Sequence, residues 1–344
     1  MGNGIFRRAG RAALAVWALA SLLFLLSRWA PTSDAALGLT EPTEMQATAA
    51  ETPGAHQLAQ RAARQRLGLD VPLFYFSRPV AGPGQRPGWH WNGPRNQYHR
   101  WLGALLRGDL GTSFRDGQPV AARLATALLY TLPLTGTAAV LALAVALALA
   151  AGLARGPWWR RPALAALAGL QALPLFVLAT GLLLLLANPD ALNWFPTYEQ
   201  AGAEDGLVAL GACLLPLACL VLGAVPELAL QLEASLAHEM RADYAVTARA
   251  KGLSVRRVVR RHALRNALLP VLPLVVDLLP ALVAGAVVVE TIFSLPGMGR
   301  LLAEAAATRD YPVLVGGVLL VGAARLLALL LADAGARWLD PRVS

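Results

Sequence analysis

Charged residues are scarce in this sequence. Only 15% of its 344 residues are charged, 56% are hydrophobic, and the mean hydropathy is +0.51. Soluble domains carry about 25% charged residues, so the composition excludes a soluble globular domain and predicts a protein of the lipid bilayer. The net charge of +9 is spread over short segments between apolar runs, as in the cytoplasmic loops of membrane proteins. The basic balance therefore does not indicate a nucleic-acid partner.

Cysteine and histidine are also few, and neither is placed for chemistry. Cys213 and Cys219 are the only cysteines, and both fall inside an apolar run, where cysteine behaves as a small hydrophobe. None of the five histidines lies in an apolar run, so no imidazole is available for a metal or proton-relay site within the membrane. The sequence predicts no metal site.

Lysine occurs once, as Lys251, and the next residue is Gly252. A phosphate-binding loop of the form G-x-x-x-x-G-K-[ST] is therefore absent, and we expect the chain neither to hydrolyse ATP nor to bind a cofactor. The sequence also lacks G-x-S-x-G and H-E-x-x-H, which disfavours an intramembrane enzyme and leaves no catalytic residue to predict. The six apolar stretches show no clear inverted repeat of hydropathy, which disfavours a secondary transporter.

Long apolar runs dominate what is present. A membrane-spanning helix needs about 20 apolar residues. Six stretches qualify and predict an all-α, six-span protein: about 10–29, 128–153, 163–187, 206–232, 267–289 and 312–334. We divide the chain into an N-terminal transmembrane helix (1–30), an extramembrane segment (31–119), a five-helix core (120–336) and a tail (337–344).

The short loops predict the orientation, because Lys and Arg near span ends stay on the cytoplasmic side. Basic residues precede span one, join spans two and three, join spans four and five, and follow span six, whereas 188–205 holds four acids and no Lys or Arg. Both termini are therefore expected in the cytoplasm and segment 31–119 outside. The basic start and apolar run resemble a signal peptide, but no clean cleavage pattern follows Leu26, so we expect a retained span.

The segment 241–265, called here the basic hairpin, carries eight Lys or Arg. Placing eight cations in hydrocarbon would cost on the order of 20 kcal/mol, so the hairpin must lie in water. Its sequence predicts helix, break, helix: Asp243 as N-cap of Tyr244 to Lys251, Gly252 as a left-handed stop, and Ser254 as cap of a second helix through Arg265.

Two interpretations of this hairpin remain open. It could be a solvated loop that fixes topology or touches anionic lipid. Alternatively, its first helix could dock into a groove on another protein. The helix has small and apolar residues that a purely solvated loop does not need, which favours docking: Tyr244, Ala245, Val246, Ala248, Ala250 and Leu253.

Ionisable residues within spans are candidates for function because they are costly in hydrocarbon. Asp277 in span five, Glu227 in span four and Arg325 in span six qualify. Asp277 is the most central, and could line a substrate path or bind a peptide amine. The alternative is a carboxylate inside the bundle, paired with Arg325 or with a backbone donor.

Several ordered motifs resemble one known family. "DYAVTARAKGLSVRRVVRRHALRNALLP" (243–270) is similar to the cytoplasmic coupling loop, or EAA loop, of inner-membrane permeases of bacterial ATP-binding cassette (ABC) importers, in the dipeptide, oligopeptide and nickel branch. "RLGLDVP" (66–72), "WLGALLRGDLGTSF" (101–114), "VVVETIFSLPGMGRLLAEAAATRDYPVL" (287–314) and "DAGARWLDPR" (333–342) resemble further segments of that branch in the same order.

The resemblance implies a type-1 ABC importer permease in the bacterial inner membrane, moving di- or oligopeptides or a related solute such as chelated nickel. It implies a second permease, two cytoplasmic ATPases that use ATP and Mg²⁺, an extracytoplasmic binding protein and contact with membrane lipid. The coupling loop (237–265) would fit a cleft on an ATPase through these residues: Asp243, Tyr244, Thr247, Ala248, Arg249, Ala250, Lys251, Gly252, Leu253 and Ser254.

The sequence departs from the family pattern in three places, one of which is the absence of the usual short Pro-Gly-Asp-Pro signature after span one. Near the end of span four the family usually shows Arg where this chain has Glu233. An apparent insertion at 73–98 is rich in aromatic residues, namely Phe74, Tyr75, Phe76, Trp89 and Trp91. Such residues can lie at the membrane interface, pack a small domain or contact a binding protein, and the first two are favoured.

Overall fold

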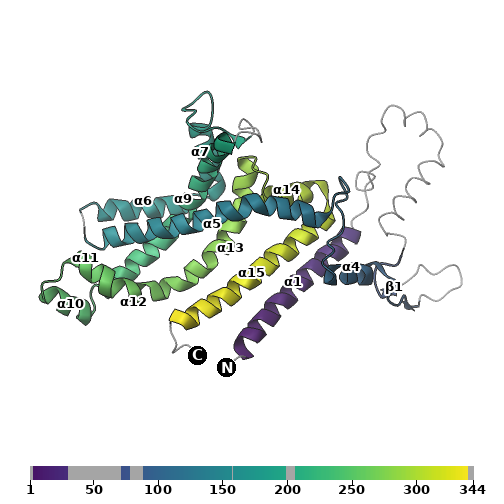
Figure 1. Cartoon of the computed structure of the whole chain (residues 1–344), viewed down its shortest axis with the longest axis horizontal. Coiled ribbons are helices and arrows are strands. Elements are labelled where there is room, and N and C mark those ends of the chain that lie inside the picture. Colours follow the sequence, from purple (N-terminus) through teal and green to yellow (C-terminus); the bar gives the residue numbers. More distant parts are fainter. Residues whose placement is uncertain (1–2, 30–70, 78–87, 157, 199–205, 340–344) are drawn as a thin grey trace. The chain divides into compact units, whose positions relative to one another are not determined.

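The computed structural model describes residues 3–29, 71–77, 88–156, 158–198 and 206–339, and these are mostly helical (Figure 1). The helices of the membrane region are α1 (Asn3–Trp29), α5 (Val120–Leu153), α6 (Arg160–Ala172), α7 (Leu175–Leu186), α9 (Gly206–Glu239), α13 (Leu272–Ile292) and α15 (Tyr311–Leu339). The shorter elements are β1 (Phe76–Ser77), β2 (His90–Trp91), α4 (Gln97–Leu106), α10 (Asp243–Ala250), α11 (Val255–Val258), the π-turn η1 (Val259–Ala263), α12 (Leu264–Leu268), the 3-10 turn η2 (Leu269–Val271) and α14 (Met298–Thr308).

The spans are recognisable by length and composition. Among the described residues, three helices are long and apolar enough to cross a membrane: Val120–Leu153, Gly211–Glu239 and Val255–Ile292. The pair α6 and α7 qualifies together as a fourth, and Ala13–Leu26 and Tyr311–Leu326 are shorter apolar helices. Each of the six predicted stretches therefore coincides with helix, and the all-α expectation is confirmed.

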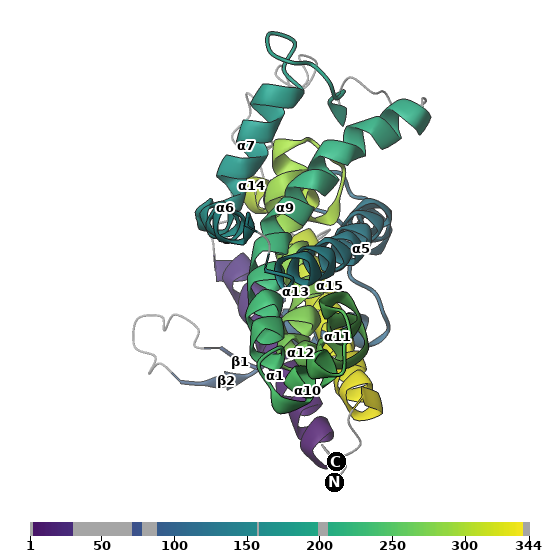
Figure 2. The ribbon, with the colours of Figure 1, turned by 90° about the vertical axis from the view of Figure 1, so that its left-hand side faces the viewer.

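The third predicted span is not one straight helix. Helices α6 and α7 meet at a bend of 101°, visible in Figure 2. Leu173 has the extended conformation (φ −79°, ψ 125°) and Pro174 is the N-cap of α7. A proline disfavours the helical conformation of the preceding residue and has no N–H to donate, so the helix ends here.

The chain forms two compact units, the second of which comprises residues 126–303 and 334–339. Its core is built around α9, which packs against α6, α7, α12 and α13. Alanines on one face of α5 are completely buried at i, i+4, i+8 and i+12, namely Ala138, Ala142, Ala146 and Ala150. Small side chains at helical spacing let neighbouring helix backbones approach closely. This close packing stabilises helix contacts in a bilayer, where the hydrophobic effect does not drive helices together.

The other unit holds residues 1–125 and 304–333, with α1, α4, the strand pair and the first part of α15. Strands β1 and β2 pair antiparallel, with Phe76 opposite Trp91. Aromatic rings link this hairpin to α1: Tyr75 stacks on Trp91, Tyr98 meets both Phe74 and Phe24, and Phe24 stacks on Trp101. The aromatic segment therefore packs a small structure, while Phe76, Trp89 and Trp91 stay exposed.

A buried aspartate ties the loop before α5 to the start of α15. Asp310 is 2% exposed and accepts a hydrogen bond of 2.5 Å from the Ser113 hydroxyl and one of 3.0 Å from the Phe114 N–H. The Arg123 guanidinium lies 3.4 Å from the same carboxylate. Two motifs singled out in the sequence, "GTSF" and "RDYP", therefore meet through this carboxylate.

Candidate functional site

The basic hairpin begins with the eight-residue helix α10, whose N-cap is Ala242. Asp243, predicted as the N-cap, instead occupies the first helical position, and no side chain caps this end. The prediction was wrong by one residue. A carboxylate in the first turn is still favourable, because the N-terminal end of a helix carries partial positive charge.

Gly252 makes the corner of the hairpin with φ +82°, as the sequence predicted. The Leu253 N–H donates to the Ala248 carbonyl at 3.2 Å and the Gly252 N–H donates to the Arg249 carbonyl at 2.9 Å. These are the two bonds of a Schellman motif, which closes a helix through a left-handed residue. Ser254 is the N-cap position of the next helix, as expected, although its side chain makes no capping bond.

The second helix does not stop at Arg265. Helical structure runs without interruption from Val255 to Ile292, through η1 and η2 into α13. The expectation of two short helices was therefore wrong for the second. Pro270 falls at the start of the 3-10 turn, where its missing N–H costs little, so it does not end the helix. The corner is thus joined to a membrane span by continuous helical structure.

One face of α10 packs against the chain itself. Ala245 is fully buried and Ala248 is 9% exposed, in a cluster that includes Leu236, Val258 and Ala263. Sequence reasoning placed both alanines on a face suited to docking into another protein, whereas in the structure their side chains face the chain itself. Their small side chains instead allow α10 to lie close to the end of α9 and to the π-turn. Ala250 is the one predicted small residue of α10 that is exposed.

Two polar side chains hold α10 in place. The Arg249 guanidinium donates to the Met240 carbonyl at 3.0 Å and to the Ala245 carbonyl at 3.3 Å. The Tyr244 hydroxyl donates a short hydrogen bond to the Glu239 carboxylate. Burial of the phenol, and then this bond, raise the pKa of Tyr244 above its usual value. Arg249 and Tyr244 therefore hold α10 against the end of α9, and both side chains are also exposed to solvent.

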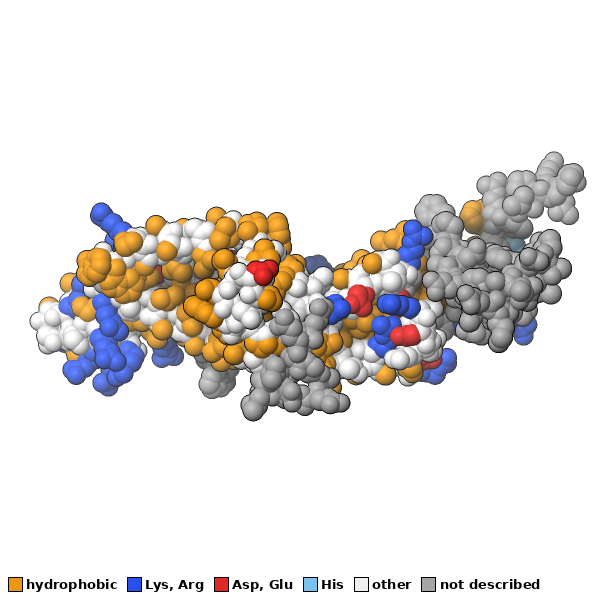
Figure 3. All heavy atoms as spheres, turned by 90° about the horizontal axis from the view of Figure 1, so that it is seen from above, with side chains coloured by type: hydrophobic (Ala, Val, Ile, Leu, Met, Phe, Trp, Pro, Cys, Tyr) orange, Lys and Arg blue, Asp and Glu red, His pale blue; other side chains and the backbone are white. Residues whose placement is uncertain are grey.

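The outward face of the hairpin combines apolar, small and cationic groups. Val246 is 47% exposed, and Thr247, Ala250, Lys251 and Gly252 are exposed beside it. The cations of the following helix are exposed as well: Arg256, Arg257, Arg260, Arg261 and Arg265. Figure 3 shows blue side chains around the part of the second unit formed by α10 and α11, next to the orange surface of the spans.

The ionisable residues predicted within spans lie on the surface. Asp277 on α13 and Glu227 on α9 are exposed, so neither carboxylate is in the interior of the second unit. Glu227 begins a row of exposed residues at i, i+4, i+7 and i+11, namely Glu227, Gln231, Ala234 and His238. Arg325 on α15 is also exposed.

Sequence reasoning missed a buried ion pair at the end of α9. Glu233 is 5% exposed and accepts hydrogen bonds from Arg160 Nη2 at 2.6 Å and Nε at 2.9 Å. Arg160 begins α6, so the pair ties the loop before α6 to α9. Glu233 was the departure from the family pattern, and the arginine that compensates it lies far away in sequence.

A second missed residue is Glu290, which is fully buried at the end of α13. Its carboxylate accepts hydrogen bonds of 2.6 Å from the Thr131 hydroxyl and from the Gly299 N–H. Thr131 in turn accepts a 2.8 Å bond from the Met298 N–H. A Cβ at Gly297 would collide with this carboxylate, and one at Gly299 would collide with the Val287 backbone. The glycines of "ETIFSLPGMG" were the available signal.

Residues 125–344 match the family described as "Binding-protein-dependent transport system inner membrane component". The chain belongs to this family. The match covers the spans of the second unit, the basic hairpin and α15, and it confirms the resemblance drawn from the motifs.

Curated relatives agree with the family. The chain is 34% identical over 254 residues to the oligopeptide transport system permease protein AppB of Bacillus subtilis (strain 168), covering 72% of this chain and 79% of that protein. It is 34% identical over 297 residues to a putative peptide permease protein of Brucella ovis, with coverages of 83% and 85%. It is 32% identical over 272 residues to the glutathione transport system permease protein GsiC of Escherichia coli (strain K12), with coverages of 78% and 79%.

These findings establish the role of the chain in broad terms. It is a non-catalytic inner-membrane permease subunit of an ABC transporter, with an all-α fold and several apolar spans.

Proposed function

We propose that this permease subunit carries peptides inward across the bacterial inner membrane, or a related small solute such as chelated nickel. Relatives named for oligopeptide, peptide and glutathione transport support a peptide cargo. A second permease would complete the pathway, an extracytoplasmic binding protein would deliver cargo, and two ATPases would supply energy from ATP with Mg²⁺. The chain itself has no phosphate-binding loop, so the partner ATPases would hydrolyse the ATP.

The proposed topology places both termini and residues 237–265 in the cytoplasm, and segment 31–119 outside. The distribution of basic residues supports it, because exposed arginines concentrate on the basic hairpin. Segment 1–30 is the first span, 120–336 contains the five helices of the core, and 337–344 is a cytoplasmic tail. Residues 30–70 and 340–344 lie outside the described part of the chain.

The observation that carries the proposal is the exposed face of α10, which is joined to a membrane span by continuous helical structure. Val246, Thr247, Ala250 and Lys251 protrude from a helix that is closed by a Schellman motif. The residues after the corner continue into α13 without a break, so a push on α10 displaces a membrane span. An ATPase cleft that moves on ATP binding could thereby drive alternating access. Asp243, Tyr244, Arg249, Leu253 and Ser254 shape or orient this surface.

The exposed acids support a polar pathway on the second unit. A carboxylate facing lipid at mid-membrane costs roughly 2.5–3.5 kcal/mol, so Glu227 and Asp277 should face water or the second permease. Each belongs to a row of small or polar residues, which for α13 is Pro273, Asp277, Ala281 and Ala284. A peptide amine passing this surface would find a carboxylate partner. Arg325 is proposed as a further pathway or helix-contact residue.

The coupling role is tested by substituting the corner glycine. Gly252→Ala adds a Cβ at φ +82° with no atom within 4 Å, so its effect is backbone strain of about 1–2 kcal/mol at the corner. Gly156→Ala is the matched control, since it also has positive φ (+70°) and open space, in the loop before α6. We expect Gly252→Ala to reduce co-purification of the ATPases and Gly156→Ala to leave it unchanged. Equal retention in both variants would contradict the coupling role.

A second variant separates docking from corner geometry. Val246→Asp places a charge on the exposed apolar patch of α10 without touching its buried face. We expect normal membrane insertion and thermal stability, but loss of ATPase binding and of substrate-stimulated ATP hydrolysis in the assembled transporter. Unaltered ATPase binding would show that the partner grips another surface.

The cargo is tested by uptake. Cells lacking this gene should lose accumulation of labelled di- or oligopeptides, and the gene restored on a plasmid should recover it. The Asp277→Asn variant should assemble with its ATPases but transport peptides with a free amine more slowly than the wild type does. Unchanged peptide uptake in the deletion strain would contradict the peptide assignment, and uptake of chelated nickel would then be measured.

A further inference from the structure

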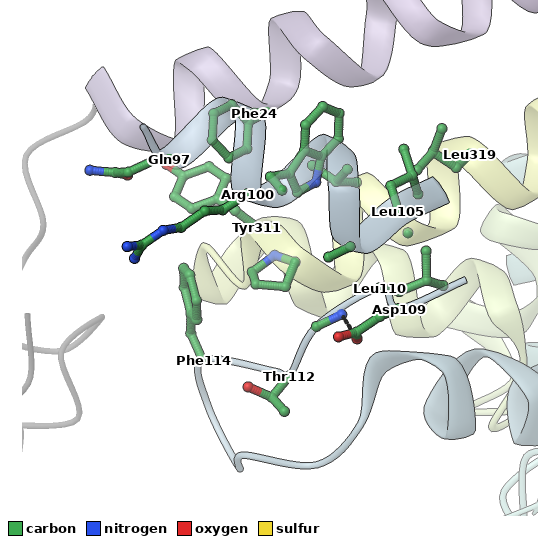
Figure 4. Close-up of a pocket in the computed structure, with 16 residues that line it drawn as sticks. Phe24, Gln97, Arg100, Leu105, Asp109, Leu110, Thr112, Phe114, Tyr311 and Leu319 are labelled. Atoms are coloured by element: carbon green, nitrogen blue, oxygen red, sulfur yellow. Dashed lines mark hydrogen bonds between the residues drawn. The ribbon is translucent and has the colours of Figure 1, made fainter. Parts of the chain in front are cut away.

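The first unit has an open cavity of about 300 Å³ in its surface, to which the proposed transport role assigns no function. It is bounded by α1, α4, the loop 109–114 and the start of α15. Its wall is mostly apolar, formed among others by Phe24, Trp101, Leu105, Leu110, Val315 and Leu319. Gln97 and Arg100 lie at one end of the cavity and Leu319 at the other (Figure 4).

The cavity lies at the end of two apolar helices. Phe24 is near the end of the apolar stretch Ala13–Leu26 of α1, whereas Tyr311 begins the apolar stretch Tyr311–Leu326 of α15. Both residues line the same cavity, so the C-terminal end of one span lies beside the N-terminal start of the other. The space between them is therefore at the boundary of the hydrocarbon layer.

Helix α4 fixes this depth independently. The Tyr98 hydroxyl lies 2.9 Å from the Ser21 hydroxyl of α1, and Trp101 stacks on Phe24 with ring centroids 4.8 Å apart. The strand pair beside α4 exposes Trp89 (74%) and Trp91 (58%). Exposed tryptophans concentrate where the hydrocarbon meets the headgroups of a membrane. Helix α4 thus lies along the interface.

We propose that this cavity binds a phospholipid, with an acyl chain against Trp101, Leu105 and Leu319 and the phosphate paired with Arg100. The apolar wall suits a hydrocarbon chain, and the cation lies at the end where a headgroup would sit. Arginine is weakly hydrated and forms charge-assisted hydrogen bonds with phosphate oxygens. The lipid belongs to the leaflet away from the N-terminus of α1, which is the outer leaflet in the proposed topology.

Other occupants fit less well. A helix of a second permease is about 10–12 Å wide, whereas a round cavity of about 300 Å³ is only about 8 Å across. A hydrophilic peptide would leave its backbone groups unpaired against the apolar wall. A single acyl chain is narrow, needs no hydrogen bonds and is already present at high concentration at this depth.

The test uses the full-length protein in nanodiscs that contain a phosphatidylethanolamine with a photoactivatable diazirine in one acyl chain. After illumination, peptide mass spectrometry should find the label concentrated in residues 101–110 and 311–319. Ala104→Phe, which fills the cavity, should abolish this labelling while labelling of the exposed residues Val140 and Leu141 on α5 persists. Retained α5 labelling also shows that the variant is folded and inserted.

The headgroup contact is tested with a diacylglycerol that carries the same diazirine chain. The wild type should label more strongly with the phospholipid than with the diacylglycerol, and Arg100→Gln should remove that preference. Arg95→Gln, at an exposed arginine that does not line the cavity, should keep it. Cavity labelling no stronger than that of α5, or cross-links to another protein chain, would overturn the proposal. The measurement needs neither ATPases nor cargo, so failure of the transport proposal would leave its outcome unaffected.

Discussion

Two connections between helices of the second unit are built in opposite ways. The basic hairpin (241–265) packs through alanines, closes with a Schellman motif and leaves its cations exposed. The segment 290–300, called here the Glu290 loop, folds around a fully buried carboxylate that bonds to Thr131 and to the Gly299 N–H. Its glycines are required because no Cβ fits beside that carboxylate.

The two segments differ because one must supply hydrogen bonds to a buried carboxylate and the other only has to pack small apolar side chains. A buried carboxylate is tolerated only when fully hydrogen-bonded, so the Glu290 loop has one permitted geometry. The hairpin depends on non-directional packing of small side chains, and its outer face contributes little to folding. Substitutions should therefore damage the Glu290 loop through stability and the hairpin mainly through partner binding.

Gly297→Ala should have the largest effect on stability. Its Cβ would displace the Glu290 carboxylate and break the bonds to Thr131 and Gly299, at about 3 kcal/mol or more. Thermal unfolding in detergent, followed by tryptophan fluorescence, should show a large loss of stability. Gly169→Ala is the control, because its Cβ meets no atom within 4 Å in helix α6 and alanine favours helix. Equal stability of both variants would contradict the packing described.

Removing the carboxylate should cost somewhat less. Glu290→Ala leaves the Gly299 N–H and the Thr131 hydroxyl without their acceptor, at about 2–3 kcal/mol. Glu290→Gln retains an acceptor and should be intermediate. Glu290→Ala also makes space for a Cβ at Gly297, so the double variant should be less destabilised than the sum of the single changes. Strict additivity would show that the two residues do not interact.

A buried alanine of the hairpin comes next. Ala245→Leu overfills the contact of α10 with its neighbours and should cost about 1–3 kcal/mol. Ala250→Leu, on the exposed face of the same helix, should leave the unfolding temperature unchanged. If Ala250→Leu lowered the unfolding temperature more than Ala245→Leu does, α10 would have to be rotated so that Ala250 faces the core.

The smallest effect is expected at Tyr244. Tyr244→Phe removes the hydrogen bond to Glu239 on a part-exposed side chain, at about 0.5 kcal/mol. The unfolding temperature should fall only slightly, and ATPase binding should persist because the ring remains. A large loss of stability would show that Tyr244 and Glu239 are more deeply coupled than their exposure indicates.

Much of the architecture was predictable because each feature is local. Apolar runs predicted the helices, and Gly252 after a small-residue helix predicted the corner with positive φ. The boundary at Asp243 was misplaced by one residue, and the break at Leu173 and Pro174 was not anticipated, although proline was its signal. The continuation of helix beyond Arg265 was also missed, because no residue between Val255 and Leu269 ends a helix.

The sequence by itself determined that the chain is helical and membrane-spanning, that it has no phosphate-binding loop motif, and that its cations gather in one hairpin. Composition and short-range periodicity decide these properties, since each depends on residues close together in the chain. The tertiary structure decided that Ala245 and Ala248 face inward, that Arg160 neutralises Glu233, and that Glu290 holds its loop through Thr131. Those pairings join residues far apart in sequence, so only packing could select them.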